Sequence, residues 1–212
     1  MNGKSIDIKA ALQFGWDTLK AHLTFFLKLL VVLIVASVIP AMILSKIGQA
    51  VGPMLGLPLQ FLNIVWQAIL GMGVLKICLK LYDRQPVDIP DLWSTVPQTL
   101  DYIVVKFLFG LIVTVGFILL IIPGLIWSIQ FYMANYLVVD KQKGPIEALK
   151  GSSTLTQGIK WDLAGFAGVV VLINLIGFVF LGVGLFITIP LTMLASVYVY
   201  RKLLAQTEAL GQ

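Results

Sequence analysis

The chain has 212 residues and a formal net charge of +5, and it is 59% hydrophobic and only 12% charged. Soluble domains are about 45–50% apolar and about 25% charged, so these fractions argue against a water-soluble enzyme or nucleic-acid-binding module. A single cysteine, Cys78, excludes an intramolecular disulfide, and a single histidine, His22, excludes a histidine-based metal cluster.

Residues 6–22 have apolar side chains at helical spacing, which predicts an amphipathic helix on the membrane surface. The charge-free run 29–45 that follows is too long for a signal-peptide core, so we expect a retained membrane helix. The next charge-free run, 47–75, supplies a second crossing.

Residues 89–100 predict a second surface helix, and the charge-free run 107–139 after it is too long for one crossing. Gly116 and Pro123-Gly124 near its middle favour two helices joined by a tight turn. Each leg is then only about 25 Å long, against a hydrocarbon core of about 30 Å. Either Lys106 extends from inside the membrane to its surface, or this hairpin is shallow or re-entrant.

A third surface helix is expected at 145–158, opened by Gly144-Pro145. The charge-free run 163–200 contains Gly182 and Gly184 near its middle and is again expected to form two helices. The prediction is an all-α membrane protein of six transmembrane helices in three hairpins, each preceded by a cytoplasmic interfacial helix. All of 1–212 forms one domain.

The charges predict the orientation, since Lys and Arg accumulate on the cytoplasmic side. With six crossings, Lys46 is alone on the far face, and the other cations and all acids share the near face. We therefore expect a multi-pass protein of the bacterial cytoplasmic (inner) membrane with both termini in the cytoplasm. Membrane lipids are its expected partners, and nucleic acid is not.

Three internal repeats, about 1–81, 82–140 and 141–205, are suggested by a proline at the predicted start of the second helix of each hairpin. These prolines are Pro58, Pro123 and Pro190. The alternative is that membrane hairpins simply favour proline near turns. Aromatic side chains near the charged ends predict an interfacial belt: Trp16, Trp93, Trp161, Tyr82, Tyr102 and Tyr200.

No catalytic motif is present in the sequence, and we expect neither enzymatic activity nor a cofactor or metal. Asp83, Asp88 and Asp91 lie in one link, where they form either a surface cation site or an ordinary solvated loop. Uncharged polar residues inside the predicted helices suggest a polar groove, although interhelical hydrogen bonding explains them equally well. They are Asn63, Gln67, Gln130, Asn135, Asn174, Thr188 and Thr192.

Residues 121–158 resemble a pattern in bacterial integral-membrane proteins related to the membrane domain beside some glycerophosphoryl diester phosphodiesterases. The matching positions are Pro123, Gly124, Asp140, Gly144, Pro145, Ala148, Leu149, Ser152 and Ser153. The resemblance implies six helices and no activity of this chain's own, because the phosphodiesterase chemistry belongs to a separate soluble barrel.

The functional hypothesis is a membrane protein that binds or moves a lipid or another amphipathic molecule. The alternative is a scaffold or accessory subunit that assembles other membrane proteins. An enzyme using Asp83, Asp88, Asp91 or Asp140 at the membrane surface is a third hypothesis.

Overall fold

The computed structural model describes residues 4–179 and 182–210, and it confirms the all-α prediction: 87% of the chain is helical, and the described residues contain no strand. The elements in chain order are α1 (Ile8–Ala21), α2 (Leu23–Val51), α3 (Pro53–Tyr82), the 3-10 turns η1 (Ile89–Trp93) and η2 (Val96–Gln98), α4 (Thr99–Leu119), α5 (Ile121–Phe131), α6 (Ala134–Lys141), α7 (Pro145–Thr156), α8 (Lys160–Val179) and α9 (Leu185–Leu210).

Several segments are long and apolar enough to cross a membrane, as a multi-pass protein requires. Among the described residues there are five, at Leu23–Ala50, Gly56–Tyr82, Ile89–Leu119, Ile121–Lys141 and Lys160–Val179. The count of six crossings and their pairing in three parallel hairpins stay predictions.

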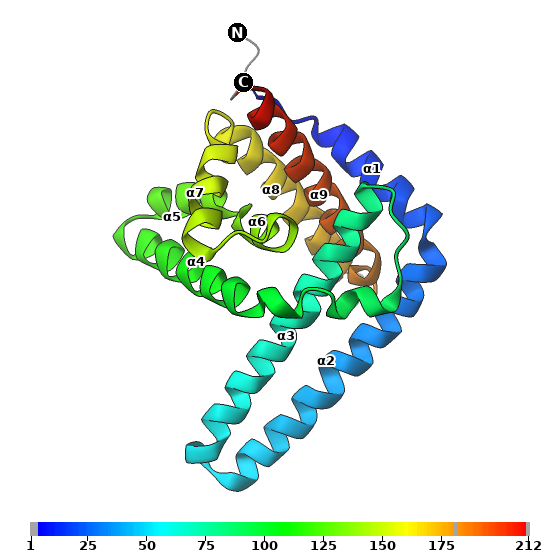
Figure 1. Cartoon of the computed structure of the whole chain (residues 1–212), viewed down its shortest axis with the longest axis vertical. Coiled ribbons are helices and arrows are strands. Elements are labelled where there is room, and N and C mark those ends of the chain that lie inside the picture. The colour runs from blue at the N-terminus through cyan, green and yellow to red at the C-terminus, as the bar shows by residue number, and fades with distance from the viewer. Residues whose placement is uncertain (1–3, 180–181, 211–212) are drawn as a thin grey trace.

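The chain divides into a helical arm and a body (Figure 1). Most of α2 and the first half of α3 project away from the other helices as a hairpin, and we call residues 33–67 the arm. Within the candidate span of α2, only 6% of the residues are buried. In the body, α1 packs along α9, and α6 and α7 pack against each other. The sequence did not predict this projecting arm.

The arm turns at Gly52, between Lys46, which separates the two charge-free runs, and Pro58, the predicted start of the second helix. Gly52 has φ +76°, a backbone conformation that residues with a side chain rarely adopt. Pro53 opens α3, whereas Pro58 lies inside it, and Pro190 likewise lies inside α9. The prediction that Pro58 and Pro190 begin their helices is therefore wrong. A glycine that permits φ > 0 marks the first turn better than a proline does.

Two of the three surface helices form as predicted, and one does not. α1 and α7 match the predicted segments within two residues at each end. The segment 89–100 instead forms η1 and η2, and α4 begins at Thr99. Pro90 and Pro97 favour these short turns, because proline suits a first helical position and breaks a helix interior.

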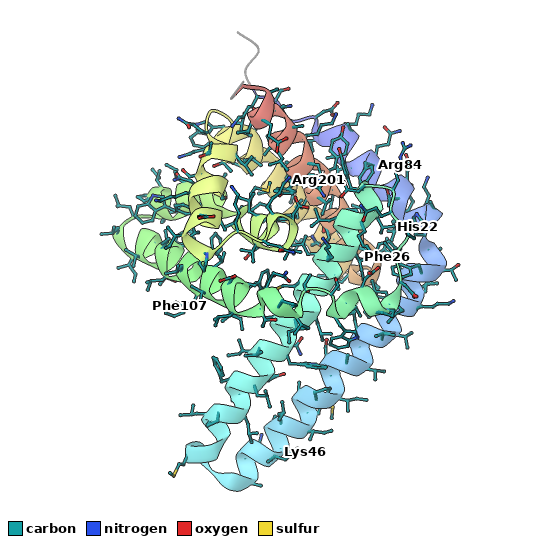
Figure 2. The ribbon with its side chains drawn as sticks, viewed as in Figure 1. His22, Phe26, Lys46, Arg84, Phe107 and Arg201 are labelled. Atoms are coloured by element: carbon teal, nitrogen blue, oxygen red, sulfur yellow. The ribbon has the colours of Figure 1, made fainter. Side chains whose placement is uncertain are left out.

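One partly buried ion cluster joins three helices of the body. Arg201 in α9, labelled in Figure 2, donates from Nη1 to Oδ2 of Asp140 in α6 at 2.8 Å and from Nη2 to Asp83, which caps α3. The Asp140 side chain is only 8% exposed, and it also accepts a hydrogen bond from Tyr200 at 2.8 Å. The cluster therefore joins α3, α6 and α9.

Two tyrosines assigned to the aromatic belt are in fact core residues. Tyr200 is fully buried and Tyr102 is 5% exposed. The hydrogen bond from Tyr200 to Asp140 explains its position, because a buried carboxylate needs donors around it.

We predict that Arg201→Met lowers the free energy of unfolding by about 3 kcal/mol, because it leaves the buried carboxylate of Asp140 without its cation. Thermal unfolding in detergent measures this loss of stability. Lys141→Met is the matched control, because it removes a positive charge from an exposed residue. Equal melting temperatures for the two variants would contradict the assigned role of the cluster.

Candidate functional site

The arm is held together by a contact that compensates for a proline. Pro40 lies inside α2 and has no N–H, so the carbonyl of Ala36 loses its helical donor. The indole Nε1–H of Trp66 in α3 donates to this carbonyl at 2.6 Å. Gln67 adds a second bond, from Nε2 to the carbonyl of Ser37 at 3.3 Å. In a bilayer such a carbonyl has no water to bind, so these side chains stabilise the stretch of α2 that contains the proline.

The two arm helices also meet nearer the turn. At Gly48 and Gly56 the backbones touch, since a Cβ at Gly56 would lie 3.1 Å from the Gly48 carbonyl oxygen. Between the two contacts lies space that side chains do not fill.

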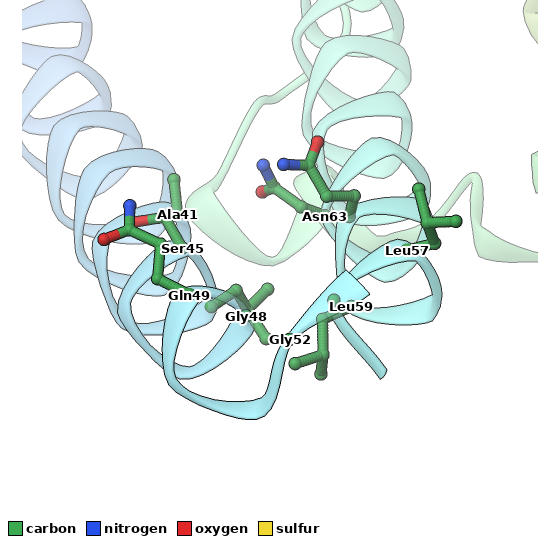
Figure 3. A pocket seen from close by; sticks show the side chains of 11 residues that line it. Ala41, Ser45, Gly48, Gln49, Gly52, Leu57, Leu59 and Asn63 are labelled. Carbon is green, nitrogen blue, oxygen red and sulfur yellow. The ribbon is translucent and has the colours of Figure 1, made fainter. Parts of the chain in front are cut away.

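The end of the arm near the turn encloses a polar cavity of about 600 Å³ (Figure 3). Its polar side chains are Ser45, Gln49, Gln60 and Asn63. Oδ1 of Asn63 is buried and has no hydrogen-bond partner among the described residues. A buried amide oxygen without a partner is costly, so a donor supplied by a ligand would be favourable here.

A second, apolar groove of about 400 Å³ lies one to two turns nearer the body. It is lined by Pro40, Ile43, Leu44, Leu62, Val65, Trp66 and Ile69. Leu44 lines both spaces, which therefore lie on either side of this residue.

Of the predicted groove residues, the structure brings Asn63 and Gln67 to this arm and places the others in the body. Asn174 in α8 donates to Thr192 in α9 at 3.1 Å, and Thr192 donates to the carbonyl of Thr188. These two bonds link the third hairpin internally. Oδ1 of Asn135 in α6 is buried and has no partner among the described residues.

Gln130 belongs to a different network, which stabilises a break in the predicted fourth helix. The α-helical hydrogen bonding is interrupted at Tyr132 and Met133, although both residues keep right-handed helical backbone angles. α5 and α6 are therefore separate helices where one was predicted. Ser152 accepts from the N–H of Met133 at 3.1 Å and donates to the carbonyl of Gln130 at 2.8 Å. Lys160 donates to Oε1 of Gln130 at 2.6 Å.

The residues of the motif at 121–158 have structural roles. Gly124 faces the aromatic ring of Phe117, where a Cβ would come within 2.5 Å of it, and Pro123 lies in the first turn of α5. Ala148 and Leu149 are buried in the core. Asp140 belongs to the Arg201 cluster described above.

The three predicted tryptophan anchors lie at the surface, and they differ in exposure. Trp161 is 82% exposed, Trp16 45% and Trp93 40%. The ring of Trp93 packs against Trp66 at 5.4 Å between centroids, so this anchor also borders the arm. Trp66 itself was not predicted.

The acidic residues Asp83, Asp88 and Asp91, which lie between the end of α3 and the end of η1, all have structural partners. Asp88 and Asp91 form a reciprocal cap at the start of η1, and Asp91 also pairs with Lys80 at 2.6 Å. Asp83 pairs with Arg201. No group of three or more metal-binding side chains is found between residues 4 and 179 or 182 and 210. The arrangement favours ion pairing over the predicted surface cation site.

We predict that Trp66→Phe destabilises the arm by about 1–3 kcal/mol, because the Ala36 carbonyl is left without a donor. In a Pro40→Ala background the backbone N–H of residue 40 is restored, and the same Trp66→Phe change is expected to cost much less. Thermal unfolding of the four proteins of this cycle measures the difference. An equal cost in both backgrounds would show that the indole N–H has no such role.

For the break between α5 and α6, we expect Ser152→Ala to cost about 1–3 kcal/mol, since the Met133 N–H loses its partner in a buried position. Ser94→Ala is the control, because the Ser94 hydroxyl bonds only within its own turn. If both variants unfold at the wild-type temperature, the break is maintained by other contacts.

Comparison with known proteins supports the interpretation of this chain as a membrane protein. The chain is 33% identical over 133 residues to uncharacterized protein Rv2560 of Mycobacterium tuberculosis and 28% identical over 94 residues to the UPF0259 membrane protein SG1383 of Sodalis glossinidius. These matches cover 62% and 44% of this chain, but only 40% and 38% of the relatives.

No family model and no solved structure matches the chain. The link to the membrane domain of glycerophosphoryl diester phosphodiesterases therefore stays a prediction. The chain is similar to a UPF0259 membrane protein, and its apolar helices are those of a multi-pass membrane protein.

Proposed function

We propose that the protein binds a lipid or a similar amphipathic molecule in the arm, with the polar part near the turn and the apolar part in the groove beside Pro40. The observation that carries this proposal is the pair of spaces that share Leu44. Their order along the arm matches a membrane lipid, whose headgroup lies at the surface and whose chains lie toward the middle of the bilayer.

The chemistry of the polar cavity indicates what the headgroup offers. Its polar groups are three side-chain amides and the hydroxyl of Ser45, which already donates to the carbonyl of Met42. One alanine, three leucines and three glycines complete the lining. Gln49, Gln60 and Asn63 both donate and accept hydrogen bonds, so they suit a headgroup with hydroxyl or phosphate oxygens. Lys46 follows Ser45 at the end of the arm (Figure 2) and adds one positive charge nearby.

The proposed location is a bacterial cytoplasmic membrane, with both termini and the body's charged face on the cytoplasmic side. This orientation is supported by the position of Lys46 at the far end of the arm, while Arg84 and Arg201 lie in the body (Figure 2). We further propose that the protein has no enzymatic activity of its own. In support, Asp83, Asp91 and Asp140 are engaged in ion pairs.

A scaffold function is the second candidate, and the large exposed surface of α2 favours it. In that case the arm would pack against a helix of another membrane protein, and its groove would hold a side chain of that partner. The two candidates differ in what remains bound after gentle extraction.

Native mass spectrometry of the extracted protein, with analysis of the lipids that co-purify, tests the proposal. We expect a defined lipid enriched over bulk membrane. Val65→Trp is expected to lower the occupancy of this lipid roughly tenfold. The indole would fill the groove, and forcing further atoms into a packed site costs about 1–3 kcal/mol. Ile64→Trp is the matched control, since Ile64 is 58% exposed and lines neither space.

Asn63→Leu tests the polar end, where we expect the lipid's enrichment to fall while bulk phospholipid still binds. Bare protein, or bulk phospholipid bound equally by the wild type and Val65→Trp, would favour the scaffold. Reproducible crosslinking of the arm to one membrane protein would then be the supporting result for that candidate.

A further inference from the structure

The turn between α4 and α5 is the most exposed aliphatic segment of the body. Leu120 is its only residue outside the two helices. The five consecutive residues Ile118, Leu119, Leu120, Ile121 and Ile122 are 62–78% exposed. None carries a polar group, whereas the turn of the arm has Lys46 and Gln49 close to it. An aliphatic surface of this kind is unfavourable in water or among headgroups.

Hydrogen bonds show how far α5 extends from the charged face of the body. Gln130, near the end of α5, binds Lys160 and Ser152. Ser152 belongs to α7, which carries Glu147 and Lys150 on its exposed side. Gln130 therefore lies at the level of charged, water-facing groups. From Gln130 to the turn, α5 spans only about 15 Å at 1.5 Å per residue.

The other leg is also shorter than the hydrocarbon core. The ammonium group of Lys106 lies 4.8 Å from the ring centroid of Tyr102, one turn earlier in α4, so this leg is counted from Tyr102. From Tyr102 to Leu119, α4 spans about 25 Å. The hydrocarbon core of a bilayer is about 30 Å thick. By comparison, the 29 residues of α2 span about 44 Å.

We propose that the α4–α5 hairpin is re-entrant: it enters the bilayer from the charged face of the body and returns to it, and its turn at Ile118–Ile122 lies among lipid acyl chains. The α5 leg, counted from Gln130, is too short to carry the turn to the far surface, and the turn has the composition of a hydrocarbon contact. In Figure 1, α4 runs across the base of the arm and not alongside it, so this hairpin is not parallel to the arm helices.

A turn inside the bilayer is favourable only if few of its backbone groups lack a hydrogen-bond partner. Three features of this turn reduce the number of such groups. Leu120 donates its N–H to the carbonyl of Gly116 at 3.0 Å. Pro123, in the first turn of α5, has no N–H that needs a partner. The carbonyl of Leu120 accepts from the N–H of Gly124 at 3.4 Å.

Accessibility measurements on spin labels test this assignment in the purified full chain in lipid vesicles. A label is attached at Leu120→Cys, with Met54→Cys at the turn of the arm and Lys141→Cys at the charged face as controls. The native Cys78 is buried and does not compete for the reagent. Collisions with oxygen report hydrocarbon surroundings, and collisions with a water-soluble nickel chelate report water.

The expected result is that oxygen collisions exceed nickel collisions at residue 120 and that the order is reversed at residues 54 and 141. High nickel accessibility at residue 120 would show that the hairpin crosses the bilayer. Low accessibility to both reagents would show a protein contact and would equally overturn the proposal. Ile118→Cys, at a residue 78% exposed, repeats the test if the label at Leu120 disturbs the fold.

Discussion

A backbone polar group that is shielded from water must find a partner within the protein, and the contacts at the two irregular helices of this chain follow from that constraint. Pro40 frees the Ala36 carbonyl, and the indole N–H of Trp66 donates to it. The interruption after α5 frees the carbonyl of Gln130 and the N–H of Met133, which Ser152 binds. The first contact holds α2 against α3 within the arm. The second joins the interruption to α7 in the body.

The charged and uncharged ends of the molecule are held by different forces. Arg201 joins Asp83 and Asp140, so one ion cluster connects the ends of α3, α6 and α9. The arm has no such cluster, and its helices are held by the Trp66 bond and by the contact of Gly48 with Gly56. A fixed body and a slender arm with few neighbours suit a protein that exposes one hairpin to lipid.

Sequence reasoning located the helices more reliably than the turns and the contacts. Apolar periodicity predicted α1 closely, and the Gly144-Pro145 start predicted α7 closely, since both are local signals. Charge-free runs did not reveal the turn at Gly52, because α2 continues past Lys46 to Val51. Of the predicted groove residues, Asn63 and Gln67 lie on α3 in the arm. Trp66 was overlooked, because its partner is a carbonyl thirty residues away that only the fold identifies.

The most direct measurement is photocrosslinking in living cells fed a photoreactive fatty acid, followed by mass spectrometric mapping of the crosslinked peptides. Lipids that merely surround the protein would label the exposed faces of α2, α4 and α8 alike. The account predicts labelling concentrated on the groove residues Ile43, Leu62 and Val65. Labelling spread evenly over the exposed helices, with none enriched in the groove, would contradict it.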